Sequence, residues 1–436
     1  MSPISRRAVL GGALAVGAAS ALAGCSAGAG LADDGRSLRY WDLFTGGDGA
    51  TMRAMLDAFR AEHPEIDLEA VTLQWGPTYY TKLAMAGAGG RAPDVAVLHL
   101  ARLPGYAPAG LLDPFDPDLL AEFDLTEENF PAAVWQRAQY NGQVYAIPLD
   151  THPYVMYYNV DVCREAGLLD ADDQLIPLRG PDAVLAAFTA AKQVTGAYGL
   201  VTETYGTDGV NPWRMWWTLY RQLGGELLTP DGRDLAIDDA KALRALTFMQ
   251  QLTSSGAAIR EADGSGSIAL FSSGQAGFMW QGDWEVTTLL ASGVPFSMTR
   301  FPAVFDNASA QADGHSLVLP HRRTRSPAQA RATYQLIAFL LRHSVTWAEG
   351  GHVPAYQPVA RSAEYRALRP QSLYASVVEE LALDPPVWFA GSASTLWLEM
   401  GAALSPVLTG RATPAEGLAA AKAAVRRLLA TPNPVQ

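Results

Sequence analysis

Apolar and polar positions between residues 38 and 110 alternate with two distinct periods. Short apolar runs predict strands at 38–44, 66–73 and 94–99. Around them, apolar residues recur every three or four positions, which predicts helices at 51–62, 79–86 and 102–109. A repeated strand–helix–strand order favours a parallel sheet with helices on both faces. We therefore predict an α/β fold.

In sheets of this kind, ligands bind beyond the carboxyl ends of the strands. This rule places Asp48 and His99 at the rim of a binding site, because each lies at or just after the end of a predicted strand. Residues 45–49 include three glycines, and we expect a loop there. The Gly-Ser repeat at 264–267 is also expected to form a loop, since no predicted strand precedes it.

The second half of the chain is richer in helical patterns and in tryptophan. Asp238, Ser326 and Thr413 each precede a helical stripe of apolar residues and are predicted to cap its first turn. Aromatic side chains gather in three short stretches, at 213–220, 278–284 and 388–397. Large aromatic side chains are highly buried on average, so these clusters fit a core as well as a ligand platform.

The N-terminal residues 1–24 are predicted to be an export signal. Arg6-Arg7 precedes Val9 and Leu10, as in twin-arginine signals, and the uncharged run 8–23 is too short to span a bilayer. Twin-arginine signals have a basic residue after this stretch, but here Gly11 takes its place. The general secretory route therefore remains an alternative.

The stretch Leu22-Ala23-Gly24-Cys25 resembles the lipobox of bacterial lipoproteins, in which the cysteine thiol carries the lipid. It predicts that Cys25 anchors the mature chain to the outer face of the cell membrane, with a flexible tether at 25–36. A plain cleaved signal with an incidental cysteine is the alternative. The other cysteine, Cys163, is expected to be a small buried hydrophobe.

Acidic residues outnumber basic ones, 44 to 32, and the net charge is −12. A nucleic-acid partner is therefore not expected, because its phosphates would be repelled. The densest basic run, 321–325, is predicted to be a solvated turn. Two cysteines exclude a disulfide framework and a thiolate zinc site. The seven histidines show no metal-ligand spacing, so neither a metal nor a cofactor is expected.

The sequence contains no nucleophile elbow, phosphate-binding loop, metalloprotease motif or dinucleotide fingerprint. Glycoside hydrolysis needs two suitably placed carboxylates, and Asp150, Glu203, Asp283 and Glu285 are candidates. A secreted carbohydrate-active enzyme is therefore one hypothesis, although the absence of these motifs favours a protein without catalytic activity.

Several short stretches resemble, in the same order, those of the extracellular solute-binding proteins of ABC importers, the maltose-binding-like group. The first is Phe59-Arg60-Ala61-Glu62-His63-Pro64-Glu65-Ile66. The stretches that follow lie at 79–83, 92–95, 110–114, 141–148, 157–161, 167–168 and 353–359. Residues 271–284 resemble the signature that ends in Gly-x-Trp, although Gln275-Ala276-Gly277 stands where the family usually has Lys-Ala-Ala.

This resemblance implies a two-lobed clamshell of the type II periplasmic-binding-protein kind, in which each lobe is a mostly parallel sheet flanked by helices. The lobes would be 37–149 plus 315–351 (N-lobe) and 150–314 plus 352–436 (C-lobe). The chain would cross between them near 148–150, 314–316 and 351–353. Such lobes close on ligand by a hinge motion.

The resemblance also implies a monomeric receptor that captures a mono- or oligosaccharide and passes it to the permease subunits of an ABC importer. Flat aromatic rings can stack on sugar C–H faces, and carboxylates accept hydrogen bonds from hydroxyl groups. The expected ligand-binding residues are Asp48, His99, Asp150, His152, Trp216, Asp283, Trp284, His315 and Tyr356. Glycerol phosphodiesters are an alternative ligand, for which Arg214 or Arg300 would supply the required cation.

Overall fold

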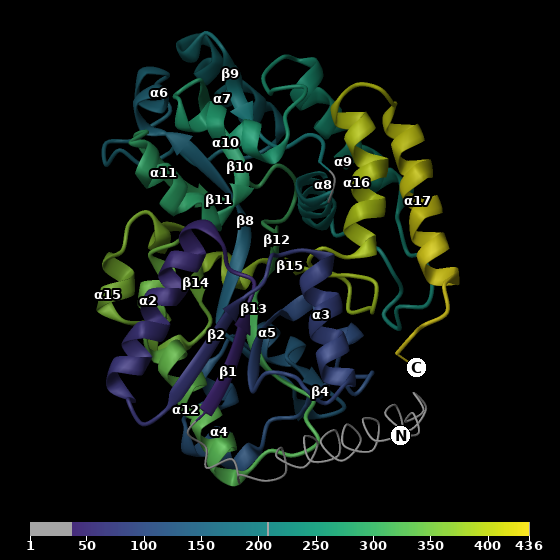
Figure 1. Cartoon of the computed structure of the whole chain (residues 1–436). Helices are drawn as coiled ribbons and strands as arrows, with labels where there is room; N and C mark the ends of the chain where they lie inside the picture. Colours follow the sequence, from purple (N-terminus) through teal and green to yellow (C-terminus); the bar gives the residue numbers. More distant parts are fainter. Residues whose placement is uncertain (1–36, 207–208, 436) are drawn as a thin grey trace, which may run out of the picture.

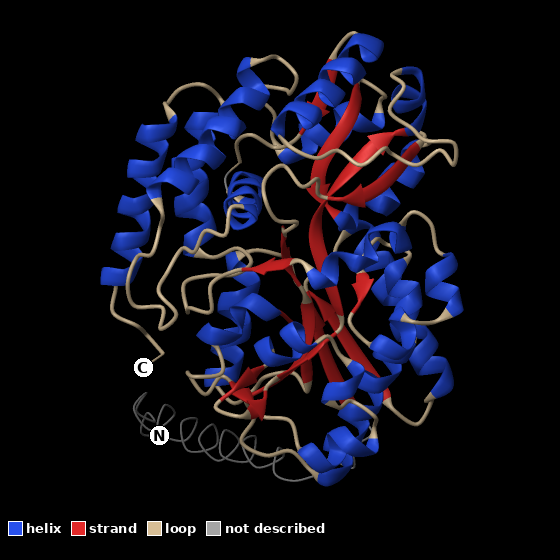
Figure 2. Cartoon of the chain, turned by 180° about the vertical axis from the view of Figure 1, so that it is seen from behind, coloured by secondary structure: helices blue, strands red, loops and turns tan. Residues whose placement is uncertain are grey.

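Two mixed β-sheets, each with its own helical cover, form the molecule (Figure 1). The computed structural model describes residues 37–206 and 209–435. The predicted export signal, Cys25 and the tether lie outside the described residues. Figure 2 shows the strands along the centre of the molecule, with helices on the outside.

The first sheet has the strand order β2-β1-β3-β13-β4, and β7 pairs with β13. Its strands are β1 (Ser37–Asp42), β2 (Asp67–Thr72), β3 (Val95–His99), β4 (Leu112–Asp113), β7 (Ala146–Pro148) and β13 (His315–Pro320). The helices of this half are α2 (Gly46–Glu62), α3 (Pro77–Ala88), η1 (Leu100–Gly105), α4 (Pro117–Glu122), η2 (Glu127–Asn129), α5 (Ala132–Arg137), α12 (Pro327–Arg342), α13 (Ser344–Ala348) and α14 (Gln357–Ala360). A small hairpin, β5 (Gln139–Tyr140) and β6 (Gln143–Val144), stands apart.

The second sheet has the order β15-β12-β8-β10-β9, and β11 and β14 pair with β8. Its strands are β8 (Asp150–Asn159), β9 (Tyr198–Val201), β10 (Ala276–Gly282), β11 (Phe296–Arg300), β12 (Ala310–Asp313), β14 (Val353–Pro354) and β15 (Leu381–Leu383). The helices of this half are α6 (Val160–Glu165), α7 (Pro181–Thr195), α8 (Val210–Gln222), α9 (Asp239–Ser254), α10 (Gly264–Ser272), η3 (Asp283–Glu285), α11 (Val286–Ser292), α15 (Ala363–Ala367), η4 (Gln371–Glu379), α16 (Thr395–Leu408) and α17 (Pro414–Ala430).

The strand pairing is more mixed than the predicted mostly parallel sheets. β1 runs parallel to β2 and β3, but β13 is antiparallel to β3 and β7, and β8 is antiparallel to β10, β11, β12 and β14. The reason is that β7 continues into β8 through Leu149, while β12 returns into β13 through Gly314. Two parallel neighbouring strands need a crossover connection between them. Here the chain instead passes directly from one sheet to the other, once in each direction.

The predicted starts of three helices are confirmed. The side chains of Asp238, Ser326 and Thr413 each accept a hydrogen bond from the first turn of α9, α12 and α17, respectively. Thr413 also forms a full capping box with Glu416. These helix starts could be predicted from the sequence, because an N-cap depends on only four neighbouring residues.

Three local predictions were wrong. The glycines of 45–49 do not form a loop, because α2 already begins at Gly46 and places Asp48 in its first turn. The Gly-Ser repeat opens α10, since Asp263 caps it by accepting from the Gly266 N–H at 2.7 Å. The predicted helix at 102–109 is instead the 3₁₀ helix η1, which contains Pro104.

The basic run 321–325 is also not a solvated turn. Arg322 forms an ion pair with the buried Asp94, and Arg325 donates to the Asp94 carbonyl oxygen at 2.9 Å. These arginines therefore tie the segment after β13 to the segment before β3.

Two separate hydrophobic cores follow the two sheets. One surrounds β1, β3 and α12, and the other surrounds β8, β10 and α8. Cys163 lies in the second core, fully buried, as predicted, and burial raises the pKa of its thiol to about 12. None of the helices in the described part of the chain combines the length and apolar character needed to cross a bilayer.

Candidate functional site

A cavity of about 460 Å³ lies between the two sheets. The first half of the molecule contributes residues 43–48, Trp75 and His99. The second half contributes Glu203, Val210, Arg214, Gly264, Ser265, Ile268, Gln281, Trp284, Glu285, Thr287, Thr288 and Ser392. Between the two halves, His152, His315 and His352 line the same space. The volume falls in the range of about 300–1,000 Å³ that is usual for small-molecule sites.

A second hollow, about 1,000 Å³ in volume, lies between the 103–140 region and the C-terminal residues 428–435. Among the described residues that line it, Asp231 is the only acid, and no histidine is present. The smaller cavity combines aromatic rings, carboxylates and imidazoles, so it is the candidate ligand site.

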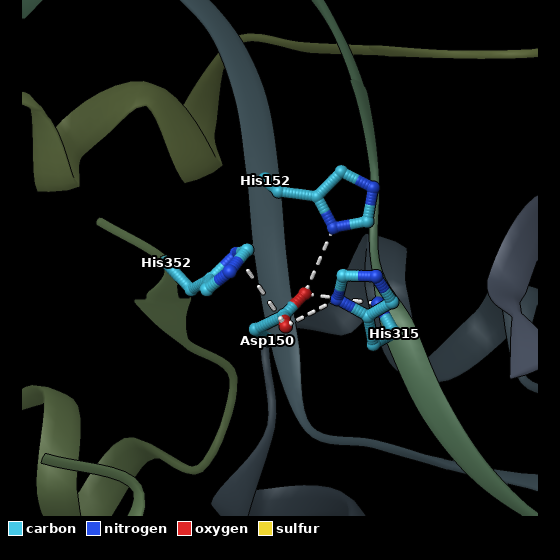
Figure 3. A group of neighbouring side chains, drawn as sticks. All are labelled: Asp150, His152, His315 and His352. Carbon is cyan, nitrogen blue, oxygen red and sulfur yellow. Dashed lines mark hydrogen bonds and ion pairs between the residues drawn. The ribbon is translucent and has the colours of Figure 1, made fainter. Parts of the chain in front are cut away.

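Asp150 is the centre of a buried hydrogen-bond network beside the cavity (Figure 3). Its Oδ1 lies 3.0 Å from His152 Nδ1, and its Oδ2 lies 2.7 Å from His315 Nδ1. The backbone N–H of His315 donates to Oδ1 at 2.9 Å, and the Trp347 Nε1–H donates to Oδ2 at 2.6 Å. Burial would raise the pKa of Asp150, but the neighbouring imidazoles hold it well below its usual range.

His352 lies among three carboxylates that come from different parts of the chain. Its Nε2 lies 3.2 Å from Asp48, and its Nδ1 lies 3.8 Å from Asp150 and 3.9 Å from Asp283. Burial would lower the pKa of His352, but these carboxylates raise it to about 10. Asp283 is fully buried, neither of its oxygens accepts a hydrogen bond, and burial raises its pKa well above the usual range.

Two further imidazoles lie close to this group. His99 and His152 have ring centres 5.2 Å apart, and each packs against His315, at 4.5 and 4.4 Å. The Tyr80 hydroxyl is hydrogen-bonded to His99 Nδ1 at 2.8 Å. Burial, reinforced by the neighbouring imidazoles, lowers the pKa of His99, and it lowers that of His152 to about 3. Both rings are therefore neutral at physiological pH.

Trp284 presents a flat ring to the cavity from η3, the short 3₁₀ helix after β10. A side chain on Gly282 would overlap the indole ring, so glycine is required there for the ring to fold back onto the strand. The guanidinium of Arg214 lies 4.5 Å from the centre of the Trp284 ring and 5.1 Å from that of Trp397. This cation–π contact holds the indole in one orientation.

The two halves of the molecule touch at the mouth of the cavity. Gly47, in the first turn of α2, lies so close to α11 that an added Cβ would be 1.9 Å from the Thr287 hydroxyl. The Trp75 Nε1–H donates to the Ser392 hydroxyl at 3.1 Å. These contacts join segments that belong to different sheets, so the structure is a closed arrangement of the two halves.

The structure brings together most of the residues predicted for the site. Asp48, His99, His152, Trp284 and His315 line the cavity. Asp150 and Asp283 lie directly behind that lining, fully buried. The sequence placed them near strand ends and crossings, and the register of β13 against β3, which pairs His315 with His99, brings two of them face to face.

Two predicted residues lie elsewhere. Trp216 is fully buried in the second core and stacks on Tyr220 at 4.8 Å, because α8 is surrounded by protein on nearly every side. Tyr356 is buried in the first core, and its hydroxyl donates to Asp124 at 2.9 Å. Of the two cations predicted for a phosphodiester, Arg214 lines the cavity, whereas Arg300 pairs with Glu380 at 2.7 Å.

The sequence analysis missed other residues of the site. Trp75 and Ser392 follow short strands in loops without a motif, so nothing in the sequence pointed to them. The grouping of histidines was missed because His152, His315 and His352 come from segments far apart in the chain. Spacing along a sequence detects a metal-ligand set only when its members share one local element.

With this geometry, the molecule has the architecture of a two-lobed binding protein. Residues 54–368 match the family of bacterial extracellular solute-binding proteins, and the chain belongs to that family. The predicted family is thereby confirmed.

Two relatives match part of the chain. An arabinooligosaccharide-binding protein from Halalkalibacterium halodurans is 26% identical over 204 residues, which is 45% of this chain and 41% of the relative. A binding protein from Brucella abortus is 25% identical over 175 residues, which is 40% of each chain. The matched segments thus span about two fifths of the length of these relatives.

Solved structures resemble the chain over most of its length. The GacH receptor of Streptomyces glaucescens, which was solved unliganded and with acarbose, has a TM-score of 0.76 at 21% identity and covers 90% of this chain and 98% of its own. The maltose-bound MalE3 of T. maritima has a TM-score of 0.75 at 18% identity, with 90% and 99% covered. The sugar-binding protein MalE of Xanthomonas citri has a TM-score of 0.74 at 19% identity, with 90% and 97% covered. At these identities, the likeness establishes the fold.

Proposed function

We propose that the protein is the substrate-binding receptor of an ABC importer and that it captures a mono- or oligosaccharide in the cavity between the two sheets. The observation that carries this proposal is the lining of the cavity. Trp284 and Trp75 offer flat rings to sugar C–H faces, and Asp48, Glu203 and Glu285 surround the same space with carboxylates that accept hydrogen bonds from hydroxyl groups. Family membership and the sugar-binding neighbours of the same fold support the assignment.

In this proposal the lobes are 37–149 plus 315–351 and 150–314 plus 352–436. The passages from β7 to β8 and from β12 to β13 support the first two boundaries. Ala355 and Tyr356 pack in the first core, so the chain touches the N-lobe once more after the third crossing. Ligand that contacts both lobes would favour closure, because it binds the closed state better than the open one.

We further propose that residues 1–24 direct export by the twin-arginine or general route and that Cys25 carries a lipid that holds a monomer at the cell membrane. The family consists of extracellular proteins, which supports export. A Cys25→Ser variant expressed in a bacterial host should leave the membrane fraction and appear in the soluble extracellular or periplasmic fraction. An unchanged membrane association would contradict the lipid anchor.

The direct test of the ligand class is a thermal-shift screen of purified protein against a panel of mono- and oligosaccharides. Binding to the folded state alone stabilises it by about 2.7 kcal/mol at a hundredfold excess of ligand over Kd. A sugar that raises the melting temperature and is recovered intact supports a transport receptor. Turnover of the recovered sugar would instead support a carbohydrate-active enzyme.

One observation favours a second ligand class, the glycerol phosphodiesters. Arg214 lines the cavity, as such a ligand would require. Its guanidinium is already stacked between Trp284 and Trp397, however, and three carboxylates line the same cavity. A glycerol phosphodiester in the thermal-shift panel tests this alternative. Stabilisation by it, with none by any sugar, would replace the carbohydrate assignment.

A further inference from the structure

The grouping of one aspartate and three histidines beside the cavity is not explained by sugar binding alone. Asp150, His152, His315 and His352 each offer one ligand atom, and these four atoms lie within 4.8 Å of one another. All four side chains are buried. From this geometry we propose that they form a binding site for a divalent transition-metal ion of the zinc class.

The distances within the group suit such an ion. Asp150 oxygens lie 3.0, 2.7 and 3.8 Å from the Nδ1 atoms of His152, His315 and His352, respectively. Bond lengths of about 2.0–2.2 Å in a tetrahedral zinc site place neighbouring ligand atoms roughly 3.3 Å apart. The three distances fall on both sides of that value. Metal binding would displace the protons that the Nδ1 atoms of His152 and His315 share with Asp150, and the proton on His352, because only a deprotonated ring nitrogen can ligate a metal. Imidazole and carboxylate are ligands that zinc accepts.

The groups behind these ligands match those that support metal sites. The Trp347 Nε1–H and the His315 N–H both donate to the Asp150 carboxylate, and they would keep it oriented once it bound a metal. His352 would bind through Nδ1 while its Nε2 faces Asp48 at 3.2 Å. A carboxylate behind a metal-bound histidine is the usual arrangement, because it fixes the ring and raises its basicity.

Two buried polar groups also favour a cation at this position. Neither ring nitrogen of the fully buried His352 has a hydrogen bond of good geometry, and the same is true of both Asp283 oxygens. Asp48, Asp150 and Asp283 surround His352, and a divalent cation bound to its Nδ1 would compensate this concentration of acidic groups. The three histidines also line the cavity, which provides a path of entry.

An ion at this position would connect three segments that pass between the sheets. His152 lies in β8, His315 begins β13, and His352 directly precedes β14. One metal would therefore cross-link the region about which the lobes turn. This proposal does not depend on the identity of the transported solute.

The test starts from purified protein stripped of metal with a chelator. Titration with Zn²⁺ in a calorimeter should show one tight site per chain, and Co²⁺ should give the visible absorption of a tetrahedral nitrogen and oxygen site. His152→Ala and His315→Ala should each weaken Zn²⁺ binding more than about a hundredfold, because even supporting residues change metal affinity about 10–100-fold. Trp347→Phe, which removes a supporting hydrogen bond, should weaken it about 10–100-fold.

The matched control is His321→Ala. His321 Nδ1 contacts Asp113 at 2.7 Å, a histidine–aspartate pair of similar geometry outside the group. Its loss should leave Zn²⁺ binding unchanged. Absence of tight binding to the stripped wild type, or binding that survives both His152→Ala and His315→Ala, would overturn the proposal.

A measurement on the wild type covers the case in which the variants fail to fold. Anomalous scattering at the zinc absorption edge, from a crystal grown with Zn²⁺, should place the ion among Asp150, His152, His315 and His352. If that crystal showed no anomalous signal among these four residues, the proposed site would be ruled out. The sugar screen repeated on chelator-treated protein separates the two proposals, since sugar binding can persist without metal.

Discussion

At the scale of single residues, Trp284 provides the sharpest test of the proposed ligand site. Its ring lines the cavity, and Arg214 and Gly282 hold its orientation. Trp284→Ala should weaken sugar binding at least about tenfold, since a lost aromatic contact is worth about 0.5–1.5 kcal/mol beyond its buried area and a tenfold change is about 1.4 kcal/mol. Calorimetric titration with the sugar found in the screen measures this.

Trp388→Ala is the matched control for that variant. Trp388 is a half-buried tryptophan that lines the larger hollow but not the candidate cavity. Its removal should leave sugar affinity within about twofold, with the melting temperatures of both ligand-free variants recorded alongside. Equal losses of affinity in the two variants would count against Trp284 as the stacking residue.

Asp384 is a residue whose effect should be on stability alone. Its buried carboxylate accepts from Trp213 and Trp397 Nε1–H at 3.1 and 2.5 Å, from Gln311 at 3.3 Å and from the Gly391 N–H at 3.1 Å. Asp384→Ala leaves these donors without an acceptor and should lower the free energy of unfolding by about 2–4 kcal/mol.

Urea denaturation measures this loss for Asp384→Ala. Asp384→Asn keeps one acceptor oxygen and should lose less than Asp384→Ala. Asp172→Ala, at an exposed aspartate, should change stability by no more than about 0.5 kcal/mol. A wild-type-like midpoint for Asp384→Ala would show that the network does not stabilise the fold.

Only part of the site could be predicted at the residue level. Asp48, His152, Trp284 and His315, which line the cavity, were predicted because strand ends and the signature of the resembling family point to them. Trp216 was misplaced, because a buried helix and a ligand platform share the same aromatic pattern in sequence. The convergence of histidines depends on pairings between distant strands, such as His152 opposite Asp313, and no local pattern encodes them.

At the scale of elements, the first turn of α2 controls how closely the lobes approach. A Cβ on Gly47 would lie 1.9 Å from the Thr287 hydroxyl in α11, so Gly47→Ala should hinder closure and weaken ligand binding. The same change should raise the stability of the ligand-free protein by about 0.4–1 kcal/mol, because alanine favours helix over glycine. The ligand affinity measured by calorimetry should therefore fall, while the melting temperature of the ligand-free protein rises.

A double variant separates steric hindrance from other effects of that change. Thr287→Gly removes the atoms that the new Cβ would meet, so Gly47→Ala with Thr287→Gly should recover most of the ligand affinity. Thr287→Gly alone serves as the reference. No recovery in the double variant would mean that the affinity loss had another cause than contact with α11.

The element scale also shows where sequence patterns succeed and fail. Strands β1, β2 and β3 and helix α3 were predicted within a few residues, since each has a clear apolar period. The starts of α2 and α10 were taken for loops, because their glycines obscured helices that neighbouring segments stabilise. Strand direction in the second sheet was missed, because it depends on the path of the chain between lobes.

At the scale of the whole molecule, ligand affinity depends on the equilibrium between open and closed lobes. When the closed state is only partly populated, the apparent affinity falls in proportion to that population. The hydrogen bond from Trp75 to Ser392 joins the segment after β2 to the segment after β15, so it forms only when the lobes meet. It should therefore stabilise closure without contributing to the stability of either lobe.

Ser392→Ala removes this hydrogen bond with little change in packing, whereas Trp75→Phe removes it and also replaces the indole ring that lines the cavity with a smaller ring. A hydrogen bond contributes about 0.5–1.5 kcal/mol, so each variant should weaken apparent sugar affinity about two- to tenfold. The double variant should lose no more than Trp75→Phe alone, because Ser392→Ala removes only an interaction that Trp75→Phe has already removed. Small-angle scattering should show a larger fraction of open molecules at equal sugar concentration, with urea midpoints unchanged. Additive losses in the double variant would mean that the two side chains contact ligand separately and that closure rests on other contacts, such as Gly47 against α11.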